Sequence, residues 1–303
     1  MKLKRLTALL LSVMLVLSLA ACGGGKDAKD DSADGDLSGK EIIIGNITPV
    51  TGAQAAYGLA ITNSIQLAID EINAAGGILG ATVKLSTKDD QGTPAEAVSG
   101  FNSLLSEGAA AIIGATLSSC TSAITSLADD EGIVLVTPSS TADSITTKDD
   151  YVFRSCFKDS FQGEMVAAYA KDQGWTKAAV LYATGDTYSS GLHDSFVKAA
   201  EKYGIEIVCE QSSSDTGAVD FSSQLATIAA SGADVLFAPY YYDAVGPKII
   251  PQAREAGFKG AIMGCDGFDG TQDYTTGDLS AYENVYFTNH YSPEDSSEIV
   301  QSY

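Results

Sequence analysis

Apolar and polar residues alternate in blocks along the chain from Lys40 onward. Nine short runs are rich in β-branched and other apolar residues, and several are continuously apolar, as strands buried on both faces should be. The pattern therefore predicts strands at 41–47, 81–90, 110–115, 133–138, 151–156, 178–184, 205–210, 234–240 and 261–266.

Segments with a helical period lie between these runs. Their apolar residues recur three and four positions apart, as in Ile61, Ile65, Ile69 and Ile72, in Leu192, Phe196, Ala199 and Tyr203, and in Phe221, Leu225 and Ile228. Glycines stand where helices should end, because glycine takes the left-handed conformation that closes a last turn; they lie in 74–77, 201–204, 228–232 and 253–257. Repeated alternation of strand and helix predicts an α/β fold with parallel sheets covered by helices.

The N-terminal segment has a different pattern. Residues 1–5 carry three cations and residues 6–19 are mostly apolar, which is typical of an export signal rather than a transmembrane helix. The signal ends in Leu-Ala-Ala-Cys at 19–22 and resembles that of bacterial lipoproteins, so we expect cleavage after residue 21 and lipidation of Cys22. The alternative is an ordinary secretory signal. Residues 22–40, rich in glycine, aspartate and serine, are expected to be a flexible tether.

Length and charge narrow the class of protein. A chain of 303 residues is typical of about two domains, and 45% hydrophobic residues fit a folded protein. Removing the three signal cations takes the formal net charge from −21 to −24, which repels nucleic-acid phosphates. We expect no nucleic-acid binding. The sequence does not decide between disulfides and free thiols at Cys120, Cys156, Cys209 and Cys265.

Polar residues follow four of the predicted strands. Ligands of parallel α/β sheets bind at the carboxyl ends of strands, where helix N-termini point outward. Hydroxyl clusters occupy 116–124 and 139–144, and we expect Ser118 or Ser119 to cap a helix beside an anion such as a carboxylate. Tyr188 is expected to be exposed ahead of a helix, and a tyrosine run at 240–242 ends another strand. Simple capping and interface packing are the alternatives.

Several stretches carry a resemblance to a known family. They are "IGNITPVTGAQAAYG" (44–58), "DEINAAGGILG" (70–80), "KDDQGTPAEAV" (88–98), "DEGIVLVTPSSTAD" (130–143), "DTYSSGL" (186–192) and "MGCDGFDG" (263–270). The chain resembles the periplasmic-type solute-binding proteins of ABC importers, in particular the group that binds leucine, isoleucine and valine. The resemblance implies two lobes of the type I periplasmic binding protein fold that close on a ligand without chemistry. It implies a first lobe of 41–157 and 288–303 and a second lobe of 158–287.

The resemblance also implies the roles of individual residues. The hydroxyls of Ser118 and Thr141 would hold the α-carboxylate of an amino acid, and the main-chain carbonyl of Ser139 would accept from its ammonium. Tyr57, Tyr188 and Tyr241 match aromatic residues that line the pocket, and Leu117 would contact the side chain. Asp266 matches the acid that holds the ammonium.

Physical chemistry agrees with this assignment. A dipolar ligand removed from water needs an anion for its ammonium and donors for its carboxylate, because an unpaired buried charge costs several kcal/mol. Asp266 stands between glycines, which allow a close approach of the ligand. Two departures from the family affect the ligand's size: leucine-type members carry a longer Glu at this position, and Phe268 follows. Other amino acids or small amides remain alternatives.

The resemblance further implies the partners. These are a free amino acid, the membrane permease of an ABC importer and the outer face of the bacterial cytoplasmic membrane, with the protein itself a monomer without a cofactor or metal. A sensor module for an amino acid or small amide is the alternative function. Because residues 284–303 begin what should be a return to the first lobe, we expect the chain to be a fragment lacking the rest of that lobe.

An enzyme is the competing class. His193, Asp194 and Ser195 are neighbours on one predicted helix and project about 100° apart, so they cannot bond as a triad. His290 stands alone, which excludes a histidine-based metal site. Asp266 and Asp269 lie in one loop and lack the opposed geometry of a glycosidase pair. The sequence therefore favours a binding protein.

Overall fold

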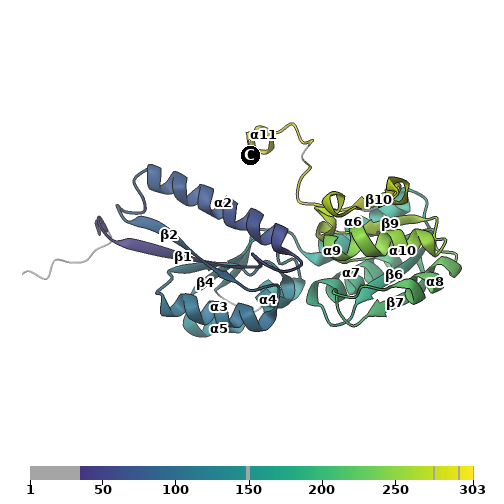
Figure 1. Ribbon diagram of the computed structural model, residues 1–303, viewed down its shortest axis with the longest axis horizontal. Coiled ribbons are helices and arrows are strands. Elements are labelled where there is room, and N and C mark those ends of the chain that lie inside the picture. The colour runs from purple at the N-terminus through teal and green to yellow at the C-terminus, as the bar shows by residue number, and fades with distance from the viewer. Residues whose placement is uncertain (1–34, 148–150, 276, 293, 303) are drawn as a thin grey trace, which may run out of the picture.

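Two parallel sheets form the two lobes of the protein, which lie side by side in Figure 1. The computed structural model describes residues 35–147, 151–275, 277–292 and 294–302. The expected signal and Cys22 lie outside the described residues. In the first lobe the strand order is β2-β1-β3-β4-β5, and every pair is parallel. The strands are β1 (Glu41–Thr48), β2 (Thr82–Asp89), β3 (Ala111–Ile113), β4 (Val134–Thr137) and β5 (Val152–Arg154).

The second lobe repeats this architecture. Its sheet has the order β10-β9-β8-β6-β7 and is also parallel throughout. The strands are β6 (Lys177–Ala183), β7 (Glu206–Ser213), β8 (Val235–Phe237), β9 (Ala261–Gly264) and β10 (Val285–Phe287). Parallel neighbours need crossover connections, and helices supply them on both sides of each sheet.

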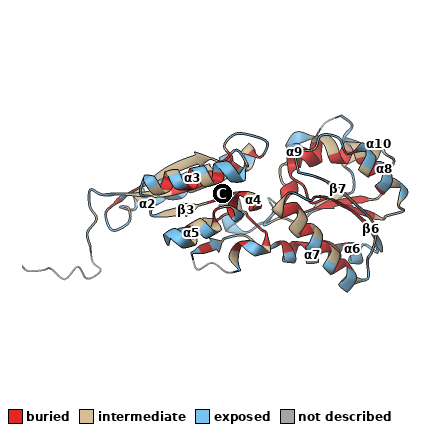
Figure 2. Cartoon of the chain, turned by 90° about the horizontal axis from the view of Figure 1, so that it is seen from below, coloured by how far each residue is buried: buried red, intermediate tan, exposed pale blue. Residues whose placement is uncertain are grey.

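Helices lie between the strands along the chain, and the longer ones cover the sheets (Figure 1). They are α2 (Ala55–Ala74), α3 (Pro94–Ser106), α4 (Ser118–Ser122), α5 (Thr125–Glu131), α6 (Asp159–Asp172), α7 (Thr187–Tyr203), α8 (Ser222–Ala230), α9 (Tyr242–Ala244), α10 (Ile250–Glu255) and α11 (Glu298–Ser302), with a π-helical turn η2 (Val245–Ile249). Short 3₁₀ turns are η1 (Asp143–Thr146), η3 (Asp266–Phe268), η4 (Thr271–Tyr274) and η5 (Leu279–Tyr282). Figure 2 shows the buried residues concentrated on the strands and on the inner faces of these helices.

The predicted elements and the structure agree closely. Each of the nine predicted strands is present, although the runs at 110–115, 151–156 and 234–240 hold strands of three residues. The glycines predicted to end helices have positive φ, with Gly204 at 71° and Gly257 at 88°. The tenth strand, β10, was not predicted, because Val285–Phe287 offers only three residues between polar neighbours.

Two expectations about helix faces need correction. Ile72 on α2 is 39% exposed although its spacing places it with buried Ile69. Phe221 is fully buried but lies at the N-cap of α8 rather than within it. Its ring packs against Tyr240, which explains the burial without a helical position.

The chain crosses from the first sheet to the second between β5 and α6. The amide of Asp159, the first residue of α6, donates to the Thr141 carbonyl at 2.9 Å, which fixes this crossing to the first lobe. At the N-terminal edge, Leu37 donates to the Leu79 carbonyl at 2.8 Å, so residues of the expected tether contact the first lobe. Assignment of 288–303 to the first lobe stays a prediction, since α11 has no buried residue. Within the described residues, no helix is both long and apolar enough to cross a membrane.

Candidate functional site

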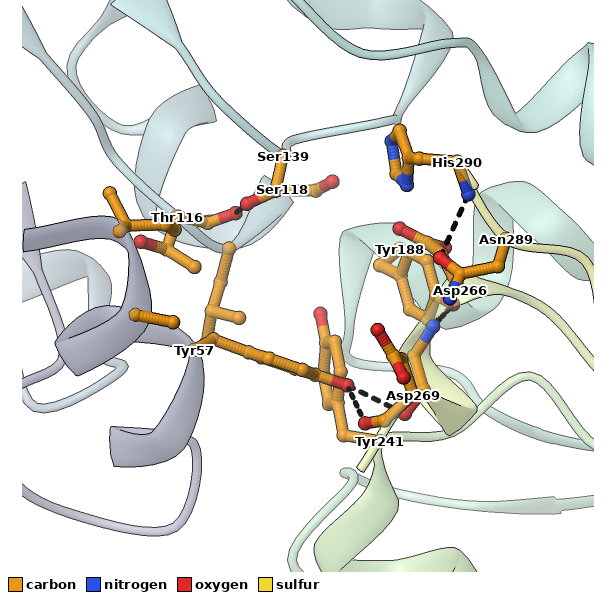
Figure 3. A pocket seen from close by; sticks show the side chains of 14 residues that line it. Tyr57, Thr116, Ser118, Ser139, Tyr188, Tyr241, Asp266, Asp269, Asn289 and His290 are labelled. Atoms are coloured by element: carbon orange, nitrogen blue, oxygen red, sulfur yellow. Dashed lines mark hydrogen bonds between the residues drawn. The ribbon is translucent and has the colours of Figure 1, made fainter. Parts of the chain in front are cut away.

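A cavity of about 190 Å³ lies between the lobes, at the carboxyl ends of the strands. A pocket of roughly 150 Å³ is enough for a benzene-sized molecule, so this cavity suits one small ligand. Figure 3 shows side chains of both lobes facing it from opposite sides. The cavity is lined by Tyr57, Ala60, Ile61, Thr116, Leu117, Ser118, Ser139, Tyr188, Tyr241, Asp266, Gly267, Asp269, Asn289 and His290.

Seven of the eight predicted ligand-binding residues line this cavity. Thr141 is the exception. It is fully buried, and its hydroxyl lies beside the Asp159 carboxyl without a hydrogen bond to any described residue. The role of Thr141 in holding a carboxylate therefore stays a prediction, and the present geometry offers Ser118 and Ser139 more directly.

The first lobe presents neutral hydrogen-bonding groups. The Ser118 hydroxyl accepts from the Ala142 amide at 3.3 Å, and the Ser139 hydroxyl donates to the Thr116 carbonyl at 2.8 Å. α4 begins at this surface, and its N-cap is Leu117, whose apolar side chain makes no capping hydrogen bond. The expectation that Ser118 or Ser119 caps α4 is wrong, because Ser118 is already inside the helix and the Ser119 hydroxyl is engaged elsewhere.

The second lobe presents the carboxylate of Asp266. This residue begins η3, and only Cys265 separates it from the end of β9. Its Oδ1 accepts from Gln162 Nε2 and from the Tyr188 hydroxyl, each at 2.9 Å. Neither donor contacts Oδ2, so this oxygen of a cavity-lining residue is available to a ligand. The glycine that follows is needed, since a Cβ at Gly267 would lie 2.7 Å from the Tyr188 hydroxyl.

The ionised carboxylate of Asp266 is destabilised by its burial. Burial raises its pKa, and the hydrogen bond from Gln162, the nearby His290 and the hydroxyl of Tyr188 oppose that rise only in part. No Lys or Arg forms an ion pair with Asp266 in the described part of the chain. A cation entering the cavity would therefore stabilise this carboxylate more than solvent does.

Aromatic rings wall the cavity. Tyr188 lies in the first turn of α7 and is 3% exposed, so the expectation of an exposed tyrosine ahead of the helix is wrong. Its ring stacks on Tyr241 with centroids 4.9 Å apart. The Tyr241 hydroxyl is buried and has no hydrogen-bond partner among the described residues. An unsatisfied buried hydroxyl costs free energy, which a polar ligand atom can recover.

Hydrogen bonds between the lobes hold the cavity closed. The Tyr57 hydroxyl, on α2 of the first lobe, donates to the carbonyls of Gly267 and Asp269 in the second lobe, at 2.8 and 3.1 Å (Figure 3). Further contacts join Gln54 Nε2 to Asp243 Oδ1 at 2.9 Å and the Ser119 hydroxyl to Asp186 Oδ2 at 2.9 Å. The two lobes are thus in direct contact around the cavity.

Sequence reasoning missed several lining residues. Asn289 and His290 lie two and three residues beyond the end of the unpredicted β10, and the His290 ring stacks on Phe157 at 3.9 Å between centroids. Asp269 was considered only as a glycosidase partner of Asp266. Gln162, which bonds to Asp266, belongs to α6 and carries no local pattern that could have revealed it.

Comparison with known proteins identifies the family. The sequence pattern of the periplasmic binding proteins matches residues 41–303. The chain belongs to this family. The periplasmic binding proteins are the extracytoplasmic solute-binding proteins of ABC transporters, and they bind rather than convert their ligands, so the exclusion of an enzyme is confirmed.

Individual relatives agree with the two-lobed fold of a periplasmic binding protein. Leu/Ile/Val-binding protein homolog 3 of Brucella melitensis is 32% identical over 251 residues, which cover 82% of this chain and 67% of that protein. The crystal structure of LivK, a leucine-binding protein of Thermotoga maritima, is 30% identical with a TM-score of 0.79 over 85% of this chain and 72% of that one. LivJ of Streptococcus pneumoniae in complex with isoleucine is 33% identical, with a TM-score of 0.73 over 82% and 70%.

Proposed function

We propose that this protein captures a free α-amino acid, branched-chain by preference, between its lobes and delivers it to the permease of an ABC importer. The observation that carries the proposal is the opposition across one cavity of a carboxylate with an open oxygen, Asp266, and neutral hydroxyls, Ser118 and Ser139. An ammonium would meet the carboxylate, and a carboxylate would meet neutral donors. One carboxylate and neutral donors in the cavity thus match a ligand that carries one ammonium and one carboxylate.

The apolar lining supports a hydrophobic side chain. Leu117 and Ile61 face the cavity from the first lobe, and the stacked rings of Tyr188 and Tyr241 face it from the second. Burying one such side chain contributes about 1.5–3 kcal/mol, which favours leucine, isoleucine or valine over small or charged amino acids. The related leucine-binding and isoleucine-bound proteins agree with this preference.

The mechanism that we propose is closure about the crossing segments. The ligand docks on Ser118 and Ser139 of the open first lobe, and Tyr188, Tyr241 and Asp266 then enclose it from the second. The closed surface is what the permease would recognise. Lipidation of Cys22 would hold the protein at the outer face of the cytoplasmic membrane, and the small residues before that cysteine support this anchor.

Thermal unfolding with a panel of amino acids tests the proposal. A ligand that binds only the folded state stabilises it by RT ln(1 + [L]/Kd), about 2.7 kcal/mol at a hundredfold excess over Kd. We expect leucine, isoleucine or valine to raise the Tm of the purified protein. No shift with any amino acid would refute the proposal.

The variant Asp266→Ala tests the ammonium contact, with a ligand that lacks the amino group as the control. It should weaken leucine binding far more than binding of 4-methylpentanoate, which is leucine without its amino group. The Kd of 4-methylpentanoate divided by the Kd of leucine, both measured by calorimetry, should therefore be lower in the variant than in wild type and approach one. Equal weakening of both ligands would show that Asp266 does not hold an ammonium.

A further inference from the structure

Gln162 is a fully buried amide that the ligand would not touch. It lies in the first turn of α6, away from the cavity lining. Its Nε2 donates to Asp266 Oδ1 at 2.9 Å, and its Oε1 accepts from the Asp266 amide at 3.0 Å. One side chain thus binds both the main chain and the carboxylate of Asp266. This pair of bonds fixes the direction in which that carboxylate points.

Gln162 is itself held in one orientation. The Thr288 hydroxyl donates to Gln162 Oε1 at 2.8 Å, so this oxygen is an acceptor and the amide nitrogen must face Asp266. α6, which carries Gln162, begins at the crossing between the lobes. Thr288 directly follows β10. The amide is therefore fixed from two separate segments of the chain.

The hydrogen bonds distinguish the two carboxylate oxygens of Asp266. Gln162 and Tyr188 both donate to Oδ1, and the Tyr188 hydroxyl in turn accepts from the Gly267 amide at 2.8 Å. Oδ1 is thereby occupied on the protein side, while Oδ2 is left toward the cavity. An ammonium placed in the cavity would then meet the carboxylate oxygen to which neither Gln162 nor Tyr188 donates.

We propose that Gln162 is the positioning residue for recognition of the ligand's cationic end, because it holds Asp266 ionised with Oδ2 facing the cavity. The inference rests on the proposed function and adds to it a residue outside the ligand's reach. Burial raises the pKa of Asp266, and among the opposing effects the hydrogen bond from Gln162 is the largest. Loss of this donor should therefore favour the protonated, non-binding form.

Other titratable groups face Asp266 and would remain in every variant. His290 lies near it, and the hydroxyl of Tyr188 bonds to it. The rest of this set are Asp159, Cys156, Cys265, Tyr57, Tyr241 and Asp269. Because these groups are common to wild type and variant, a difference between the two pH profiles reports on Gln162 alone.

The test is the pH dependence of leucine affinity in Gln162→Met. Methionine keeps the length of the side chain and removes the donor and the acceptor. Binding should need ionised Asp266, so affinity falls as pH falls through its pKa. We expect the variant to bind leucine at least tenfold more weakly near about pH 7, since a hydrogen bond to a charged group is lost. The pH at which its affinity falls by half should lie above that of wild type.

Two further variants keep the test decisive. Gln173→Met alters an exposed glutamine at the end of the same helix and should leave the profile unchanged. Thr288→Val removes the hydroxyl that orients Gln162 and should shift the pH profile toward higher pH, as Gln162→Met does, but by a smaller amount. This variant replaces Gln162→Met in the test if Gln162→Met does not fold. An unchanged pH profile in folded Gln162→Met or Thr288→Val would overturn the inference while leaving the proposed function intact. A wild-type protein that binds no amino acid would refute both.

Discussion

At the scale of the residue, buried acids differ in what surrounds them. Asp266 keeps one oxygen toward the cavity, whereas Asp90 is fully buried and its Oδ2 has no partner among the described residues. The Gly92 amide donates to Asp90 Oδ1 at 2.9 Å. Burial nevertheless raises the pKa of Asp90 to about 6. Asp90 makes no hydrogen bond to a predicted ligand-binding residue, so we expect its replacement to change the stability of the fold.

The variant Asp90→Asn should be more stable than wild type at alkaline pH. An acid whose pKa is higher in the folded than in the unfolded state stabilises the fold below about pH 4 and loses that contribution as the pH rises through about 6. Asparagine removes the cost of the buried charge. In urea unfolding we expect the free energy of unfolding of the variant to exceed that of wild type by up to roughly 3 kcal/mol at about pH 8. This difference should vanish at about pH 4.

Asp89→Asn is the neighbouring control and should have the opposite sign. Although burial raises its pKa, hydrogen bonds from Thr51, Gln91 and Val50 lower the pKa overall. Asp89 therefore stabilises the fold above its unfolded pKa, and its replacement should lower stability near about pH 8. The same sign for both variants would contradict this account.

At the scale of the element, α6 and α7 approach closely enough to exclude a side chain. A Cβ on Gly163 would lie 2.8 Å from the Phe196 amide nitrogen. This contact brings together the two helices that carry the Gln162 amide and the Tyr188 hydroxyl. Both donors to Asp266 Oδ1 thus depend on one helix pair.

Gly163→Ala should therefore affect both stability and binding. Overpacking of a close contact costs roughly 1–3 kcal/mol, and separation of the helices would lengthen the bonds to Asp266. We expect a lower Tm together with weaker leucine binding. Gly191→Ala is the control, because its Cβ would meet only the Asp159 side chain, at 3.1 Å, and alanine favours the helix by about 1 kcal/mol. Comparable losses in both variants would refute this explanation.

The elements show what the sequence could and could not predict. Nine strands follow from local apolar runs, the helix ends follow from glycines, and seven cavity residues follow from the polar strand ends and the family resemblance. β10 is too short for its own pattern to reveal it. Gln162 acts from the middle of the chain on Asp266, more than a hundred positions away, and no local spacing encodes such a contact.

At the scale of the whole molecule, the lobes are joined by polar contacts outside the cavity. Gln54 and Asp243 meet across the cleft, and the Tyr242 hydroxyl donates to the Ala53 carbonyl at 3.0 Å. Neither Gln54 nor Asp243 lines the cavity. Such contacts exist only in the closed form, so they favour closure whatever ligand is inside.

Gln54→Ala should raise the Kd of every ligand by the same factor. Loss of a hydrogen bond to a charged group that forms only on closure corresponds to about tenfold weaker binding. Titration calorimetry with leucine and with valine would measure the factor and the ratio of the two constants, which should stay unchanged. The control is Gln66→Ala, also on α2, whose amide bonds to Asp70 of the same helix at 2.7 Å. A changed selectivity would show that Gln54 contacts the ligand.

The hydrogen bonds of Tyr57 between the lobes would set how long the proposed ligand stays bound. Its hydroxyl donates from the first lobe to the carbonyls of Gly267 and Asp269 in the second lobe, so a ligand bound as proposed would leave only after those bonds have broken. In the proposed mechanism the rate of opening would therefore govern the lifetime of the complex, and a protein that closes tightly would also release its ligand slowly.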